Sequence, residues 1–271
     1  MLYATVDTFS LDRGPCAFAL GLCKAAGAGL TGFLVNLDAN APANPAGRSL
    51  EQAREDFRQR AEANAAHAAA LVAQGGAAGV DAQVVTALDH SRGVVGCLAD
   101  HARLHDVLII GADRGGLMSD RLVAESALFE IGRPMIVVPA GHEAGFACRR
   151  IAVAWDNSRV AARALADGLS VLPGVEEVIL LTIGGEKAVH SSLADHEVEA
   201  VLARRGVTAS VVRHDLAGRD IGSALQDGAI ALGADVLAMG GYGHSRLRDF
   251  ILGGATLSVL ADPRLPVLLS H

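Results

Sequence analysis

The sequence predicts an α/β protein built from two tandem copies of one parallel-sheet domain. Three observations support this fold class. The two halves of the 271-residue chain repeat each other in several places. Within each half, short apolar runs alternate with longer helical stretches, as in strand-helix-strand units. The composition is 51% hydrophobic but only 4% aromatic, so the core must consist mainly of Ala, Val, Leu and Ile, as in buried parallel strands covered by helices.

The repeat is clearest at three predicted strands. LYATVDTFS, whose strand ends at Asp7, matches IAVAWDNS, whose strand ends at Asp156. DVLIIG, ending at Gly111, matches DVLAMG, ending at Gly240. RPMIVVPA matches the C-terminal LPVLLSH. Self-similarity of this kind indicates that each half is one structural unit.

A polar, glycine-containing segment, AGHEAGFACRR, separates the two units. We therefore expect one domain over residues 1–140 and a second over residues 149–271. The first copy is longer, and we expect its additional residues between Asp38 and His67, in a loop followed by a long charged helix. The second copy has three additional residues after its DVL strand, at a place where a functional site would be expected.

Each element of the first copy can be assigned from its pattern. The expected order is a strand ending at Asp7, a helix over 15–26, a strand over 30–37, the long helix, a strand over 80–86, a helix, the DVLIIG strand, a helix and the last strand. Strands that alternate with helices form a parallel sheet with right-handed crossovers. Ligands of such sheets bind outside the carboxyl ends of the strands, where the strand order reverses. The residues expected at these ends are Asp7, Gly111, Asp156, Thr182 and Gly240.

Charge and composition exclude several classes of partner. The formal net charge of −7 argues against binding to nucleic acid or to an anionic membrane surface, because both require a basic surface. No apolar run approaches the roughly 18 residues of a membrane helix. Four cysteines at no paired spacing, with a strand-like start instead of a leader, predict reduced thiols and a cytoplasmic protein.

A glycine-rich segment follows the DVLAM strand of the second copy. It reads GGYGHSRLRDFILGGATLSVL, with Gly240 and Gly243 followed by Gly253 and Gly254 at the start of a helix. Glycines let a backbone approach an anion closely, and the N-terminus of a helix attracts one. We therefore expect a phosphate site here. The alternative, that the glycines only shape a tight strand-to-helix connection, stays open.

This segment resembles the loop of the universal stress protein family, whose nucleotide-binding members carry G-x-x-G, nine residues, and then G followed by Ser or Thr. The resemblance extends over essentially the whole chain, twice. It implies an adenine nucleotide alpha hydrolase-like fold, with a five-stranded parallel sheet of order 3-2-1-4-5 in each copy. It also implies ATP or another adenine nucleotide as the ligand, with or without Mg²⁺.

Carried over by position, the resemblance assigns roles to residues of the second copy. The phosphates would lie on the loop glycines and the adenosine near Asp156. The base would lie against Met239 and either Thr182 or Ile183. The full set of assigned residues is Asp156, Thr182, Ile183, Met239, Gly240, Gly243, His244, Ser245, Gly253 and Gly254. One departure is Gly254, which stands where the family has Ser or Thr and so removes a hydroxyl contact. Thr256, if already helical, points elsewhere.

The first copy departs further from the pattern. Arg114 stands in place of the second glycine, and Arg121 in place of the glycine that opens the helix. Arginine side chains would fill a phosphate site instead of framing it. We therefore expect nucleotide in the second copy alone, and a structural and pairing role for the first.

Several alternatives remain at this point. Cys97, His101 and His105 recur at four-residue intervals and could supply zinc ligands, although they drift around the helix. Because no catalytic pattern is present, we expect a binding protein that acts through unidentified protein partners and not an enzyme. An interaction protein without nucleotide and a slow ATP hydrolase are the alternatives. The copies should pair through their last strands, 135–138 and 267–270; a homodimer is also open.

Overall fold

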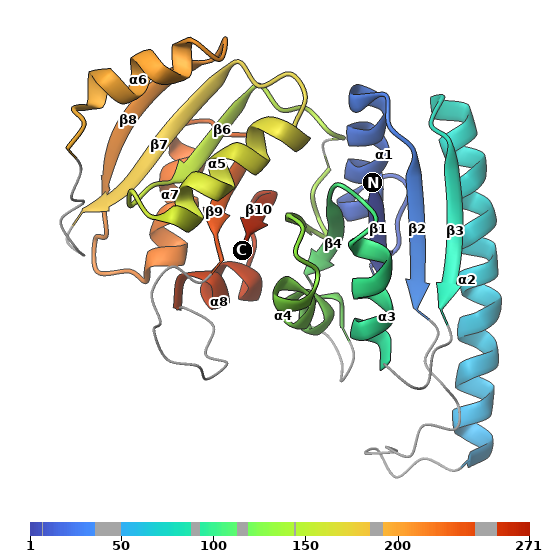
Figure 1. Cartoon of the computed structure of the whole chain (residues 1–271). Coiled ribbons are helices and arrows are strands. Elements are labelled where there is room, and N and C mark those ends of the chain that lie inside the picture. The colour runs from blue at the N-terminus through green and yellow to red at the C-terminus, as the bar shows by residue number, and fades with distance from the viewer. Residues whose placement is uncertain are drawn as a thin grey trace.

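The protein is described by a computed structural model (Figure 1). The structure describes residues 1–6, 8–35, 50–87, 93–112, 119–143, 145–184, 192–241 and 254–271, except the side chains of Leu50 and Ala53. Strands and helices alternate along both halves of these residues. The predicted α/β class is therefore confirmed.

The first copy contains five strands and four helices within the described residues. They are β1 (Leu2–Thr5), α1 (Gly14–Ala26), β2 (Leu30–Val35), α2 (Leu50–Ala78), β3 (Ala82–Ala87), α3 (Gly93–Ala102), β4 (Leu108–Ala112), α4 (Asp120–Glu130) and β5 (Met135–Pro139). The second copy repeats this series. Its elements are β6 (Arg150–Ala154), α5 (Arg159–Val171), β7 (Glu177–Gly184), α6 (Asp195–Ala203), β8 (Thr208–Asp215), α7 (Ile221–Ala231), β9 (Val236–Gly240), α8 (Gly254–Ala261) and β10 (Val267–Ser270).

All strands of the described chain join one sheet. Its order is β3-β2-β1-β4-β5-β10-β9-β6-β7-β8. Each half thus has the predicted order 3-2-1-4-5, and every pairing within a half is parallel. The two halves run in opposite senses across the sheet, so the copies are related by a pseudo-twofold axis at its centre.

The two copies meet through β5 and β10. These strands are antiparallel, with Val137 opposite Val267 and Ile136 opposite Leu268. All four side chains are fully buried. The predicted pairing of the last strands is confirmed, and it covers two sheet edges that would otherwise expose unpaired backbone groups.

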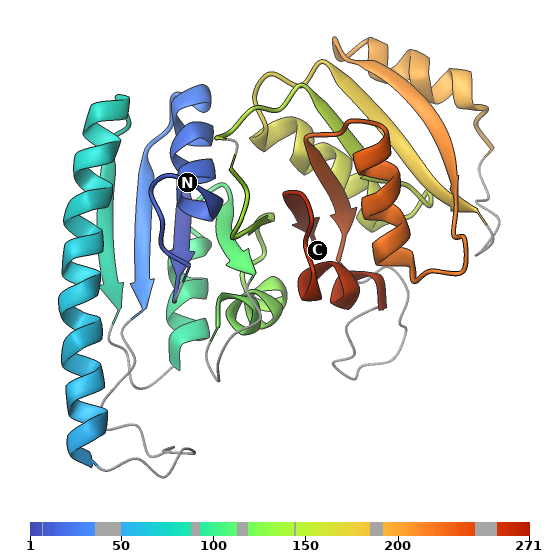
Figure 2. The same ribbon diagram turned by 180° about the vertical axis from the view of Figure 1, so that it is seen from behind.

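Helices cover both faces of the sheet (Figures 1 and 2). One buried cluster packs α1, α2, α5 and α6 against one face, and the other packs α3, α4, α7 and α8 against the opposite face. Most positions of these strands are apolar, because both faces of the sheet are buried. None of the described helices is long and apolar enough to cross a membrane.

Helix α2 accounts for the greater length of the first copy. It has 29 residues, whereas its counterpart α6 has nine. Its C-terminal half is anchored by the buried Leu71 and by Asn64, whose side-chain amide donates to the Val35 carbonyl at 3.0 Å. Its N-terminal part extends beyond the sheet, as both views show. The expected long helix is therefore confirmed, whereas the expected loop before it lies outside the described residues.

The segment between the copies is docked on α1. The Gly14 amide donates to the His142 carbonyl at 2.7 Å, and the Phe146 ring lies edge-on to Phe18 at 5.4 Å between centroids. A Cβ at Gly21 would come within 2.7 Å of the Phe146 nitrogen, so this position accepts only glycine without a shift. The expected linker thus packs against α1 of the first copy.

Candidate functional site

The strand order reverses between β6 and β9 in the second copy. From β6 the chain proceeds to β7 and β8 on one side, and it later returns to β9 and β10 on the other. The helices that follow β6 and β9 therefore leave the sheet on opposite faces. This is the place where open α/β sheets bind ligands, at the carboxyl ends of the strands. The corresponding place in the first copy lies between β1 and β4.

Asp156 shapes the turn that leads from β6 into α5. Its Oδ1 accepts the Ser158 amide at 2.9 Å, and Asn157 between them has φ 60°. Asn is among the residues that tolerate this left-handed conformation. Ser158 is the N-cap of α5, with its Oγ accepting the Ala161 amide at 3.2 Å. Asp156 is therefore a turn residue with an exposed side chain, and Ser158 holds the capping position.

The residues assigned to the base lie deeper than the turn. Thr182 is half-buried, and its hydroxyl donates to the Trp155 carbonyl at 3.0 Å, which ties the end of β7 to the end of β6. With its one proton engaged, this hydroxyl can only accept a further hydrogen bond. Met239 and Ile183 are 3% and 8% exposed and belong to the core under α3, α4, α7 and α8. They offer little surface to a ligand in this structure.

Gly240 ends β9 against the start of α5. A Cβ at this position would lie 2.6 Å from both Cβ and Cγ2 of Val160. Packing against α5 is thus sufficient to explain why a glycine occupies this position. The next residue, Gly241, donates its amide to the Ser270 carbonyl at 2.6 Å, which joins the loop to the end of β10.

The rest of the glycine segment is described only in part. Gly243, His244, Ser245 and Gly253 lie outside the described residues. Gly254 begins the described part of α8, and a Cβ added there would meet no described atom within 4 Å. Thr256 is helical and 2% exposed, so its side chain points into the core, as expected.

In the first copy, Arg121 is the second residue of α4, and the expectation that its side chain fills a phosphate site stays a prediction. Its guanidinium pairs along α4 with Glu125 at 2.8 Å and remains about one-third exposed. The residue before it, Asp120, is fully buried, and its carboxylate reaches the end of β1 instead. Arg114 lies outside the described residues. Sequence reasoning missed Asp120 because it considered only the position that aligns with Gly253.

His101 and His105, two of the candidate zinc ligands, make contacts with other residues of the first copy. Both ring nitrogens of His105 are engaged, with the His101 carbonyl at 2.8 Å and the Thr31 hydroxyl at 3.0 Å. His101 packs against Phe33, with 5.4 Å between ring centroids. No group of three or more potential metal ligands occurs among the described residues. These contacts do not favour the zinc alternative for Cys97, His101 and His105.

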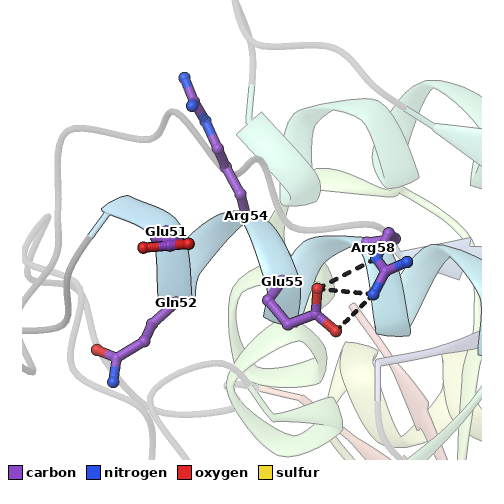
Figure 3. A pocket seen from close by; sticks show the side chains of 5 residues that line it. All are labelled: Glu51, Gln52, Arg54, Glu55 and Arg58. Carbon is purple, nitrogen blue, oxygen red and sulfur yellow. Dashed lines mark hydrogen bonds and ion pairs between the residues drawn. The ribbon is translucent and has the colours of Figure 1, made fainter.

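Two of the hollows on the surface of the described residues lie away from the strand-order reversals. One, of about 580 Å³, is lined by α2 alone, through Glu51, Gln52, Arg54, Glu55 and Arg58 (Figure 3). Within it Arg58 pairs with Glu55 at 2.8 Å, and hydrogen bonds from Arg58 lower the pKa of Glu55. The other, of about 360 Å³, lies around Pro173 and Arg205. Neither includes a residue assigned to the candidate site.

Comparison with known proteins gives structural but no sequence matches. No family model matches the sequence, and no curated protein matches it. Among solved structures, a universal stress protein from Archaeoglobus fulgidus DSM 4304 superposes with a TM-score of 0.69 at 18% identity, over 100% of this chain and 96% of the other. A protein assigned to the same family from Pseudomonas aeruginosa UCBPP-PA14 gives 0.54 at 13% identity, over 99% and 92% of the chains. The chain therefore has, over its whole length, the fold of universal stress proteins.

Proposed function

We propose that this chain is a cytoplasmic universal stress protein of the tandem type that binds one adenine nucleotide in its second copy. It acts in the stress response through protein partners and not by catalysis. The two copies have different tasks. The second holds the ligand, and the first completes the sheet and stabilises the pair.

One observation carries this proposal: the glycine segment begins at the carboxyl end of β9, beside β6, and ends at the N-terminus of α8. The strand-order reversal, the glycines and the helix N-terminus thus coincide in the second copy. Gly254 adds no side chain in front of that helix, and its surroundings are open among the described residues. An anionic phosphate chain is the ligand that such a backbone attracts.

The surrounding residues suit a nucleoside. Asp156 lies exposed at the end of β6, where its carboxylate could accept hydrogen bonds from ribose hydroxyls. Thr182 could accept one from an amino group on the base, because its own proton is engaged with the Trp155 carbonyl. Phosphoryl transfer would also require a group that orients water and a ligand for a metal ion. The sequence of the loop offers no evident pair of this kind, so we expect binding without turnover.

Isothermal titration with ATP tests the proposal. The wild type should bind one equivalent, and Gly243→Val should weaken binding at least about tenfold, equivalent to 1.4 kcal/mol, because a side chain blocks the close backbone approach. Thr256→Ala is the matched control in the following helix and should retain affinity. Circular dichroism checks that both variants fold.

Equal losses in the two variants would show that backbone approach at the loop does not hold the phosphates. Absence of ATP binding by the folded wild type would reject the nucleotide and favour the interaction protein without ligand. Two equivalents would contradict the assignment of separate tasks to the copies.

A further inference from the structure

A fully buried carboxylate lies at the N-terminus of α4 in the first copy. Asp120 is the first residue of this helix and has no exposed surface. Its Oδ1 accepts the Val6 amide at 2.5 Å. Its Oδ2 accepts the Thr5 hydroxyl at 3.1 Å and also the Thr8 hydroxyl. A backbone amide and two hydroxyls, more than a hundred residues away in sequence, thus converge on one side chain.

The donors are themselves held in place. The Thr5 hydroxyl accepts the Thr8 amide at 3.0 Å while it donates to Asp120, so the turn after β1 is closed around the carboxylate. Gly111 at the end of β4 leaves the necessary space, since a Cβ there would lie 2.9 Å from Oδ2 of Asp120 and 2.5 Å from Oγ1 of Thr8. These groups form a cradle for an anion. A buried carboxylate is tolerated where several donors and a helix N-terminus surround it.

The groups around Asp120 correspond to two parts of the proposed nucleotide site of the second copy: the start of α4 corresponds to the start of α8, and the turn after β1 to the turn after β6. Helix α4 connects β4 to β5 as α8 connects β9 to β10, and β1 lies beside β4 as β6 lies beside β9. The repeat places Thr5 and Thr8 opposite Ala154 and Asn157. With Pro134 aligned to Pro266, the residue opposite Asp120 is Leu252. The acid and its two hydroxyl donors therefore occur together in the first copy, and all three are replaced in the second.

We propose that Asp120 is a built-in anion of the first copy, which takes the place of a ligand phosphate, seals this copy against nucleotide and ties α4 to the end of β1. The first copy is thus closed by its own side chain. The inference concerns the first copy alone and holds whether or not the second copy binds ATP.

Chemical rescue tests this proposal. Asp120→Ala removes only the carboxylate and leaves a space that formate matches, whereas Asp120→Asn keeps the space filled. Thermal unfolding is followed in sodium formate and in sodium chloride of equal ionic strength. Both variants should unfold roughly 5–10 °C below the wild type, because the buried donors lose both acceptor oxygens in Asp120→Ala and face one NH2 group in place of an acceptor oxygen in Asp120→Asn. Formate should raise the midpoint of Asp120→Ala saturably by several degrees above the chloride value, and inorganic phosphate serves as a second probe.

Formate should not raise the midpoints of Asp120→Asn or of the wild type above their chloride values. Equal rescue in all three proteins, or none in folded Asp120→Ala, would overturn the proposal. If Asp120→Ala does not fold, carbon-13 NMR of the wild type at pH 7 decides. The Asp120 carboxyl carbon, assigned by its loss in Asp120→Asn, should resonate as an ionised carboxylate, and a protonated value would reject the built-in anion.

Discussion

Ile136→Ala tests whether the two copies unfold as one unit through β5 and β10. Ile136 is fully buried in β5 and lies opposite Leu268 of the other copy. The substitution removes every carbon beyond Cβ and should cost about 2–5 kcal/mol, the usual range for large-to-small changes in a core. With a urea m-value of about 3 kcal/mol per molar, the unfolding midpoint falls by roughly 0.7–1.7 M.

The single tryptophan makes this prediction specific. Trp155 follows β6, so its fluorescence reports on the second copy although Ile136 belongs to the first. Far-UV circular dichroism reports on the whole chain. We expect both signals to move together to the lower midpoint. Leu104→Ala, at a position 84% exposed in the first copy, is the control and should change the free energy of unfolding by no more than about 0.5 kcal/mol.

A split transition in Ile136→Ala would refute the unfolding of the two copies as one unit. A Trp155 midpoint equal to that of the wild type, with only the circular dichroism signal displaced, would mean that the second copy is stable without its partner. The antiparallel contact would then be an association of independent domains and not the centre of one cooperative sheet.

Three further predictions concern single sites. Hydrogen bonds from the Ser223 and Ser258 hydroxyls and from the Ser223 amide lower the pKa of Asp220, the N-cap of α7, to about 2; Asp220→Ala should therefore cost about 1 kcal/mol at pH 7. Because the folded-state pKa is depressed, this difference should shrink in urea titrations as the pH falls from about 4 towards the folded-state pKa of about 2, and a difference at pH 2 as large as at pH 7 would contradict the assignment. Burial raises the pKa of Cys16 and Cys148 to about 12 and of Cys23 to about 11. Iodoacetamide at pH 8 should therefore label the half-buried Cys97 first. Peptide mass spectrometry follows the labelling, and earlier modification of any other cysteine would contradict this prediction. Gly254→Ser should tighten ATP binding by up to about tenfold through a recovered hydroxyl contact without phosphate release, and sustained turnover by the wild type would identify a hydrolase.

Much of the fold could be predicted because its signals are local or repeated. Apolar strands such as DVLIIG and DVLAMG match between the halves, and each is bounded by helical stretches. The junction of β5 and β10 could be expected because each copy otherwise ends in an open edge strand whose residues are almost all apolar. The location of the additional residues of the first copy also followed from the repeat, and α2 contains them.

The details of the site could not be predicted because they depend on contacts between distant residues. Asp120 and Thr5 are 115 positions apart, and no local pattern shows that they meet. A comparison of the two copies does carry a signal, since the first alone combines Thr5, Thr8 and Asp120. Similarly, the packing of Gly240 against Val160 depends on how α5 lies on β9, which the glycine spacing does not reveal.

Native mass spectrometry shows directly how many nucleotides each chain binds. The protein is equilibrated with ATP at a concentration well above its dissociation constant, and the mass of each intact chain gives the number of nucleotides bound. We predict one nucleotide for the wild type, and one for Asp120→Asn, in which the first copy stays filled. At an ATP concentration about ten times the wild-type dissociation constant, we predict that Gly243→Val is occupied to about half or less, because a tenfold weaker site is half filled there. A wild type that binds none, or two, would contradict a single nucleotide site in the second copy.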